Sequence, residues 1–228
     1  MQILLKKDMK ILLVGASSDI AQNLYNNHKN NYNFIRLSSD LEHSDVDNFN
    51  LQDPTTYVDE DNIDGIVYFP GTIVLKPFKQ LSLETFENDY NINVLGLIKI
   101  LKYYEAKLSE NSSLVFISTV AAKVGMPFHA SISMCKSSLE ALARSLAAEW
   151  SPKVRVNCVA PSLVETKLAK RFFRNDKQKE MMSDRHPLKK TGVADDISSA
   201  VEYLISKKSK WVTGQVFGVD GGMSTIKI

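Results

Sequence analysis

Two protic side chains with an alkyl residue between them are the first candidates for chemistry in this chain. Thr119 is followed thirteen residues later by Ile132, and Lys136 comes four residues after that. The amphipathic pattern of residues 131–150 predicts a helix, so Lys136 lies one turn beyond Ile132 on the same face. Thr119 and Lys136 carry groups that hold or donate protons, whereas Ile132 has no proton to give. A proton-transfer site here therefore needs a different donor at this point.

His129 is the nearest residue that could act as that donor. It lies seven residues before Lys136, and its imidazole can titrate near neutral pH. Ser131, Ser133 and a water bound to Lys136 are further candidates. A histidine in a loop is more often a polar surface residue, and a lysine on a helix often extends into solvent. Both interpretations of these side chains stay open.

A second site is indicated by a glycine-containing turn between an expected strand and an expected helix. Backbone N–H groups at such a helix start, with the helix dipole, can bind the pyrophosphate of a nucleotide. Asp19 would repel phosphate if it pointed inward, but as the N-cap of the helix it would face sideways, and we favour the cap. The residues expected to line this turn are Gly15, Ser17, Ser18, Asp19 and Ile20.

Short apolar runs alternate with helical patterns along the chain, which is typical of parallel βαβ units. Expected strands cover residues 10–14, 33–37, 46–51, 65–69, 114–118, 154–159 and 215–219. Expected helices cover residues 19–28, 54–60, 83–108, 131–150 and 194–206. The pattern predicts an α/β fold, a doubly wound parallel sheet of about seven strands. Residues 1–228 form a single domain in this interpretation, without a repeat or linker.

The segment 166–186 is polar, basic and helical in propensity, with Phe172, Phe173, Met181 and Met182 as its apolar residues. It is inserted where a parallel sheet presents the carboxyl ends of its strands, and ligands bind at that edge. The segment is a candidate substrate lid. An ordinary pair of surface helices would give the same composition, because Met and Phe also fill cores.

Composition excludes several classes of function. Lys and Arg number 28 against 26 Asp and Glu, a net charge of +2 with no massed basic patch, which argues against nucleic-acid binding. No apolar run is long enough for a membrane span or signal peptide, so we expect no membrane association and a cytoplasmic location. Cys135 and Cys158 lack CxxC or histidine neighbours, so we expect buried thiols and no metal site.

Several segments, in the correct order, resemble the short-chain dehydrogenase/reductase family, in particular its 3-oxoacyl-carrier-protein reductase-like members. The resemblance covers nearly the whole chain from Lys10 and implies a Rossmann-like fold. The most specific matches are Val154-Arg155-Val156-Asn157-Cys158-Val159-Ala160-Pro161-Ser162, His186-Pro187-Leu188, Val212-Thr213-Gly214-Gln215 and Val219-Asp220-Gly221-Gly222. Departures are Asp19 and Ala21 for two loop glycines, Tyr68 and Phe69 for the Asn pair of the NNAG motif, and Ser162 for Gly.

The resemblance implies an NAD(P) cofactor and assigns further residues to it. Those assigned are Asn50 and Leu51 at the adenine, Pro70 and Gly71 after a strand, Lys136 at the ribose, and Pro161, Val164 and Thr166 near the nicotinamide. Ser38 and Ser39 after the second strand favour NADP, whereas Asp40 could hold the ribose of NAD if the turn is one residue longer.

The same resemblance assigns catalytic roles and exposes a gap. Thr119 takes the place of the family's Ser, Lys136 that of its Lys, and Asn93 that of the Asn that holds a water beside the Lys. The family's catalytic Tyr position holds Ile132. Related enoyl reductases carry a Tyr at the offset of His129, so His129 is a candidate for protonating an enolate.

Two functions remain open on the sequence. The first is an NAD(P)-dependent oxidoreductase with a non-standard proton donor, acting on a carbonyl, enoyl or hydroxyl group of a small or carrier-bound substrate. The second is a non-catalytic nucleotide-binding homologue that serves as a subunit or scaffold. The family resemblance implies a homodimer or homotetramer in either case. A non-redox isomerase or dehydratase would need an acid–base pair that the sequence does not reveal.

Overall fold

Six parallel strands form the centre of the molecule. The computed structural model describes residues 9–227, and its sheet has the order β2-β1-β3-β4-β5-β6. The strands are β1 Lys10–Val14, β2 Asn33–Leu37, β3 Ile63–Tyr68, β4 Leu108–Ile117, β5 Val154–Pro161 and β6 Val216–Val219. Every pair of neighbours is parallel, so all the carboxyl ends meet at one edge of the sheet. This confirms the predicted fold class.

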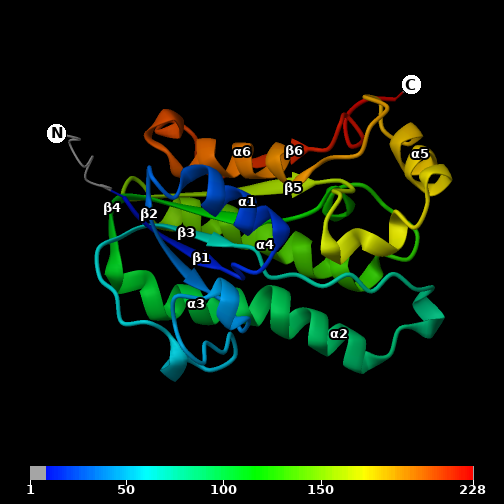
Figure 1. Cartoon of the computed structure of the whole chain (residues 1–228). Coiled ribbons are helices and arrows are strands. Elements are labelled where there is room, and N and C mark those ends of the chain that lie inside the picture. The colour runs from blue at the N-terminus through cyan, green and yellow to red at the C-terminus, as the bar shows by residue number, and fades with distance from the viewer. Residues whose placement is uncertain (1–8, 228) are drawn as a thin grey trace.

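Helices cover both faces of the sheet, as Figure 1 shows. The helices are α1 Asp19–His28, α2 Leu83–Tyr90, α3 Gly96–Tyr104, α4 Ala130–Glu149, α5 Asp176–Asp184 and α6 Ala194–Ile205. One core cluster lies between the sheet and the layer of α3 and α4, and the other lies under α1 and α6. In α4, buried residues recur at helical spacing, including Ile132, Cys135, Leu139 and Ala143, and this stripe fixes the helix against the sheet.

The long helix expected at 83–108 is interrupted by one turn of π-helix, η4 (Asn91–Leu95), between α2 and α3. A π-turn inserts an extra residue in the helical repeat and is often found at functional sites. Asn93 lies in the middle of it and is fully buried. The turn therefore sets the direction of the Asn93 side chain.

The expected strand at 46–51 is wrong, and the sheet of the described residues has six strands rather than about seven. Asn48 has a φ of 57°, a left-handed conformation that ends any extended run. Phe49 and Leu51 pack into the α3 side of the core instead of pairing with β2. The helix expected at 54–60 is reduced to a 3-10 turn, η2 (Pro54–Thr56), capped by Asp53.

Both cysteines are buried free thiols, as predicted, and burial raises the pKa of Cys135 to about 11. Within residues 9–227 no helix has the length and apolar character needed to cross a bilayer.

Candidate functional site

A cavity of about 780 Å³ opens at the carboxyl edge of the sheet. Its volume lies in the range of small-molecule and cofactor sites. Most of the residues predicted from the sequence line it: Gly15, Ser17, Ser18, Asp19, Ile20, Ser38, Ser39, Leu51, Pro70, Gly71, Thr119, His129, Lys136, Pro161, Val164 and Thr166. Asn50 and Asn93 do not reach its wall. The cavity therefore unites the two sites that the sequence suggested separately.

The turn after β1 holds one end of the cavity in a conformation that requires glycine. Gly15 has a φ of 78°, and a Cβ there would lie 2.9 Å from Pro70 Cδ. Its N–H donates to the Leu37 carbonyl at 2.8 Å, which ties the turn to the end of β2. The start of α1 therefore faces the cavity with its first N–H groups.

Asp19 is not the N-cap that we favoured from the sequence. Ser18 caps α1, its Oγ accepting from Ala21 N at 3.1 Å, because Ser18 is the last residue with extended backbone. Asp19 is the first helical residue, and its carboxylate accepts a hydrogen bond from the Lys167 backbone and lies 3.9 Å from Lys167 Nζ. The carboxylate is thus engaged by the segment after β5.

The end of β2 presents hydroxyl groups and no available cation. Ser38 is buried and its Oγ accepts from Asp40 N at 3.1 Å. Asp40 in turn caps the following 3-10 turn through Glu42 N. Arg36 is paired with Asp45 at 2.6 Å, which raises the pKa of its guanidinium. The side chains left facing the cavity here are those of Ser38 and Ser39.

Asn50 and Leu51 lie beside each other but differ in their surroundings. Asn50 is exposed, and its Oδ1 accepts from Gln52 N at 2.9 Å in a local turn. Leu51 lines the cavity and packs against the α3 core. Leu51 is therefore the member of this pair that a bound nucleotide would meet.

Lys136 projects from α4 into the middle of the cavity wall. It is only 5% exposed, and its Nζ donates to the Pro70 carbonyl at 3.3 Å. Burial lowers its pKa to about 8. No salt bridge to Lys136 is present among residues 9–227. A buried cation without a partner anion is costly, and a polar ligand would offset that cost.

Asn93 lies behind Gly71, with Lys136 on the same side. Asn93 Nδ2 donates to the Asp89 carbonyl at 2.8 Å and to Thr72 Oγ1 at 3.1 Å. Its Oδ1 is buried and accepts no hydrogen bond from residues 9–227. A Cβ on Gly71 would lie 3.3 Å from Lys136 Nζ and 3.6 Å from Asn93 Oδ1, so glycine leaves both polar atoms room.

Thr119 and Ile132 both line the cavity. Thr119 follows β4, and its Oγ1 accepts from Ala121 N at 3.3 Å while its hydroxyl proton is left for the cavity. Ile132 lines the cavity on α4, is 5% exposed and packs one turn before Lys136. Thr119 thus supplies a hydroxyl group and Lys136 an ammonium group, whereas Ile132 supplies only hydrocarbon.

His129 immediately precedes α4, is half-buried and lines the cavity. Its Nδ1 lies 2.7 Å from the Pro127 carbonyl, a group that can only accept, so Nδ1 is the donor. The ring is therefore held by its own loop, whereas Lys136 Nζ is bonded to the Pro70 carbonyl.

Sequence reasoning missed a buried hydrogen-bonded chain behind the Lys136 side of the cavity. Asp89 on α2 is 0% exposed and accepts from Thr72 Oγ1 at 2.5 Å and from Ser131 Oγ at 2.6 Å. Thr72 lines the cavity, whereas Ser131 is fully buried. The only signal in the sequence was an acidic residue four positions before Asn93 in the same expected helix.

A second polar contact that sequence reasoning missed joins β5 to the segment before α6. His186 is 2% exposed, with Nε2 at 2.9 Å from Ser162 Oγ and Nδ1 at 2.9 Å from the Met182 carbonyl. Both Ser162 and His186 line the cavity. The bond holds the end of α5 against the carboxyl end of β5.

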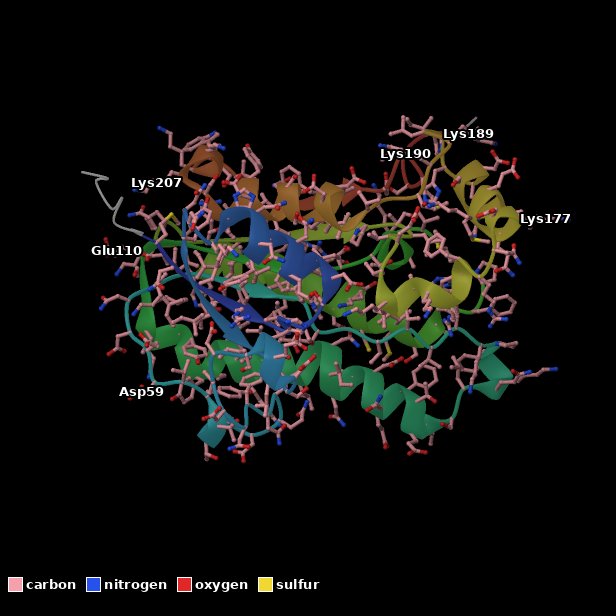
Figure 2. The ribbon with its side chains drawn as sticks, viewed as in Figure 1. Asp59, Glu110, Lys177, Lys189, Lys190 and Lys207 are labelled. Atoms are coloured by element: carbon pink, nitrogen blue, oxygen red, sulfur yellow. The ribbon has the colours of Figure 1, made fainter. Side chains whose placement is uncertain are left out.

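The segment 166–186 covers the cavity from one side. Figure 1 shows α5 at the end of the sheet toward which the β5 arrow points, and Figure 2 shows Lys177 projecting away from the body there. Leu168, Phe172 and Met182 line the cavity. Outside it, Lys179 pairs with Glu165 at 2.7 Å, which lowers the pKa of Glu165. The segment therefore forms part of the cavity wall, and its role as a substrate lid stays a prediction.

Comparison with known proteins places these features in context. A family model described as enoyl-(acyl carrier protein) reductase matches residues 50–224. A tropinone reductase homologue from Arabidopsis thaliana is 34% identical over 157 residues, which are 68% of this chain and 60% of that protein. The aligned region thus spans less than two thirds of that relative.

Solved structures share the fold over almost the whole chain. A short-chain dehydrogenase/reductase (glucose/ribitol dehydrogenase) from Brucella melitensis aligns with a TM-score of 0.86 and 23% identity, covering 96% of this chain and 97% of that one. A 4-hydroxyisoleucine dehydrogenase complexed with NADH aligns with a TM-score of 0.83 and 22% identity, covering 96% and 100%. At these identities the likeness establishes the fold.

Proposed function

The chain belongs to the short-chain dehydrogenase/reductase family, and we propose that it is an NAD(P)-dependent oxidoreductase whose proton donor is not the usual Tyr. Its substrate is a small or carrier-bound molecule that presents a carbonyl, enoyl or hydroxyl group. The names of the matched family model and of the relatives support reduction of such groups, and each of those activities belongs to the protein named.

The observation that carries the proposal is the buried Lys136 in a cavity that begins at the Gly15 turn. A lysine whose pKa is lowered to about 8 by burial, with one carbonyl as its hydrogen-bond partner, is costly to the fold. The hydroxyl groups of a nucleotide ribose would provide its further partners. A scaffold without a ligand would gain nothing from such a buried cation.

The residues around the cavity fit a dinucleotide. The N-terminus of α1 would hold the pyrophosphate, with Ser38 and Ser39 at the adenosine ribose and Leu51 at the adenine. Pro161, Val164 and Thr166 would border the nicotinamide. When bound, the cofactor supplies or takes up a hydride. Thr119 then donates a hydrogen bond to the substrate oxygen, and Lys136 orients the ribose and adds positive charge.

We extend the proposal to NADP rather than NAD. Ser38 and Ser39 line the cavity at the end of β2, and Asp40, the acidic residue that would suit NAD, is used as a cap. Titration with NADPH and with NADH, followed by nicotinamide fluorescence, measures the preference. Tighter binding of NADH would contradict this choice.

The function is tested by turnover once binding is shown. Tropinone and crotonyl-coenzyme A serve as probe substrates, because they present the ketone and enoyl groups of the proposed class. We expect oxidation of NADPH with at least one of them. Binding of neither nucleotide would overturn the proposal, as would bound NADPH that no ketone or enoyl probe oxidises.

The alternative function, a non-catalytic nucleotide-binding subunit or scaffold, is favoured by three departures from the family pattern on the cavity wall: Ile132 for the Tyr, Asp19 for a loop glycine and Phe69 for an Asn. It predicts nucleotide binding without turnover, and assembly as a homodimer or homotetramer. Sedimentation of the protein with and without NADPH measures the assembly. Turnover of either probe would exclude this alternative.

A further inference from the structure

The site needs a proton source that Ile132 cannot provide, and the wall beside Lys136 contains an acid with a path to the cavity. Asp89 is fully buried on α2, where its carboxyl group contacts two hydroxyl groups. One of these, Ser131, is itself 0% exposed and does not line the cavity. The other, Thr72, lines the cavity. Any proton that Asp89 exchanges with the cavity must therefore pass through Thr72.

We propose that Thr72 and Asp89 form the proton relay of this site, with Thr72 touching the substrate oxygen and Asp89 exchanging a proton with Thr72 from behind. The inference rests on the proposed oxidoreductase function and adds a donor to it. Thr72 is the catalytic residue in this arrangement, and Asp89 acts through it.

The hydrogen-bond inventory of Thr72 supports this assignment. A threonine hydroxyl has one proton and two acceptor lone pairs. Asn93 Nδ2 already donates to Thr72 Oγ1 at 3.1 Å, and Asp89 Oδ1 lies 2.5 Å from the same atom. When Asp89 carries a proton, Thr72 accepts from both neighbours, and its own hydroxyl proton is free to point into the cavity. When Asp89 is ionised, Thr72 donates to it and offers the cavity no proton.

The relay balances in both directions. In reduction, the hydride of NADPH goes to the substrate carbon and the Thr72 proton forms the new O–H bond. Thr72 Oγ1 takes the proton of Asp89, which is left as a carboxylate. After product leaves, cavity water returns a proton to Asp89 through Thr72. Oxidation would begin with Asp89 as a carboxylate and with bound NADP⁺ as the hydride acceptor: the substrate carbon loses its hydride, the substrate hydroxyl gives its proton to Thr72, and the Thr72 proton moves to Asp89.

The surroundings of Asp89 keep the relay isolated from other acids. The titratable groups on the adjoining face of α4 are the Cys135 thiol, whose pKa burial raises to about 11, and Lys136. Asn93 on η4 and Ser131 on α4 are neutral. His129 is not part of this hydrogen-bonded network, because its Nδ1 lies 2.7 Å from the Pro127 carbonyl. Thr72 is one of two cavity-lining hydroxyls with a carboxyl group directly behind it; the other, Ser118, donates to Glu140 Oε1 at 2.6 Å. Thr72 is the better candidate because it is half-buried, whereas Ser118 is only 3% exposed.

Three substitutions test the relay in the NADPH-bound protein, with the probe substrate that the wild type reduces. Asp89→Asn keeps both hydroxyl contacts, since an amide can accept from one and donate to the other. Thr72→Val removes the hydroxyl and Thr72→Ser keeps it. Single-turnover hydride transfer is followed by nicotinamide absorbance. We expect Asp89→Asn and Thr72→Val to lower the rate about 10²–10⁴-fold, and Thr72→Ser to retain most of it.

The matched control is Asp59→Asn, which makes the same change at an exposed residue at the far end of the molecule (Figure 2). We expect its rate to equal that of the wild type. NADPH affinity should stay within about two-fold of the wild type in all variants, which separates a lost proton from a lost cofactor site. Asp89→Asn should also remove one ionisation from the pH profile of the rate.

A readout without turnover uses the infrared band of a protonated carboxyl group. A band that is present in the wild type and missing in Asp89→Asn is that of the Asp89 carboxyl group, and Thr72→Val should shift it. Unchanged rates in Asp89→Asn and Thr72→Val would overturn the relay while leaving the oxidoreductase function intact. If Asp89→Asn does not fold, the Thr72→Val and Thr72→Ser pair decides. A loss confined to His129→Gln would move the donor role to His129.

Discussion

Lys136 is the residue on which the electrostatics of the cavity depend. Its ammonium group is buried on α4 with the Pro70 carbonyl 3.3 Å away, and burial lowers its pKa from the usual 10.5 to about 8. Such a shift corresponds to about 3 kcal/mol against the charged folded form. At about 8 the lowered pKa still lies above neutral pH, so the ammonium group remains charged there and can bind an electron-rich oxygen. Function and stability are therefore opposed at this position.

The substitution Lys136→Met tests this opposition, because Met has a similar shape and no charge. Below about pH 8 both the folded and unfolded wild type carry the charge, so the folded state bears the whole penalty. The variant should then be more stable by about 3 kcal/mol. Between about pH 8 and 10.5 only the unfolded wild type binds the proton, so wild-type stability rises with pH and the difference disappears. Urea unfolding at pH 7 and pH 10 measures it.

A difference that stays constant with pH would show that Lys136 is not charged and buried as described. The variant Lys153→Met is the matched control, since Lys153 is exposed and its pair with Glu110 spans 3.6 Å. We expect that change to alter stability by less than about 0.5 kcal/mol at either pH.

Ile132 offers a complementary test of the proton relay. A Tyr at this position would place a phenol one turn before Lys136 on the cavity wall, where the ammonium favours its ionisation and proton transfer. We expect Ile132→Tyr to raise NADPH-dependent ketone reduction, and to restore much of the rate lost in Asp89→Asn. The measurement is the rate of the double variant relative to Asp89→Asn alone. No gain in a folded double variant that binds NADPH would show that position 132 does not face the reacting oxygen.

Single residues also show what the sequence could and could not reveal about the site. Gly15, Thr119 and Lys136 were predicted because each sits at a fixed offset from a strand or helix end. Thr72 and Asp89 were not, because seventeen positions separate them and only the fold brings them within 2.5 Å. Ser162 and His186 meet for the same reason. Local spacing in the sequence predicts functional groups that one helix or strand positions. Contacts between two elements can be predicted only when the packing of those elements is known.

The Asp19 carboxylate at the start of α1 binds the backbone N–H of Lys167, so a single residue connects α1 to the segment after β5. A negative charge there stabilises the helix but opposes a pyrophosphate at the same N-terminus. We expect Asp19→Asn to tighten NADPH binding about 3- to 10-fold while keeping an oxygen for the Lys167 N–H. Fluorescence titration measures the affinity.

The control for Asp19→Asn is Asp176→Asn at the first residue of α5, an exposed position outside the cavity lining. It removes the same charge from another helix start, and we expect NADPH affinity to be unchanged. Weaker binding in Asp19→Asn would mean that the carboxylate assists the cofactor by holding the 166–186 segment in place.

At the scale of elements, a hydrogen bond from Tyr68 joins β3 to the π-turn of the long helix. Tyr68 and Phe69 stand where the family has two Asn residues, yet Tyr68 Oη donates to the Ile92 carbonyl at 2.5 Å. The bond reaches the π-turn η4, where a carbonyl departs from the usual helical pairing. Burial also raises the pKa of Tyr68, which keeps the phenol protonated as a donor.

Gly96 makes this contact possible and supplies a stability test. A Cβ at Gly96 would lie 2.6 Å from Tyr68 Oη and 2.8 Å from Leu51 Cδ2, both in the core. We therefore expect Gly96→Ala to lower the free energy of unfolding by about 1–3 kcal/mol despite the better helix propensity of Ala. Gly125→Ala is the control, because a Cβ there meets nothing within 4 Å. Equal stability of the two variants would contradict the packing around Tyr68.

Most helices and strands were predictable from the sequence, and the predictions that were wrong have local causes. The bounds of α1 were predicted correctly from its apolar spacing, although the helix is capped by Ser18 and not by Asp19. The segment 46–51 contains the apolar residues of a strand, but Asn48 adopts a φ of 57° and turns the chain. Its apolar side chains enter the core as a loop instead. Hydrophobicity thus predicted which residues are buried, whereas the backbone conformation determined that they lie in a loop and not in a strand.

At the scale of the whole molecule, the cavity is lined by residues from both halves of the sheet. Gly15 and Ser38 come from the β1–β2 side, while Thr119 follows β4 and Pro161 ends β5. The 166–186 segment adds a further wall through Phe172. A ligand that fills this cavity contacts elements that are far apart in the chain, so its binding free energy should add to the stability of the whole fold.

Ligand-linked stabilisation is therefore the test that belongs to this scale. A ligand that binds only the folded chain at 100 times its dissociation constant adds about 2.7 kcal/mol. For a chain of this length, about 2–4 °C per kcal/mol gives a rise in Tm of about 5–10 °C, in one cooperative transition. Differential scanning calorimetry with NADPH measures it, and adenosine monophosphate, which reaches only one half of the cavity, should give a smaller rise. Equal shifts from the two nucleotides would mean that the nicotinamide half of the cavity contributes no binding, because the contacts beyond the adenosine site would then be absent.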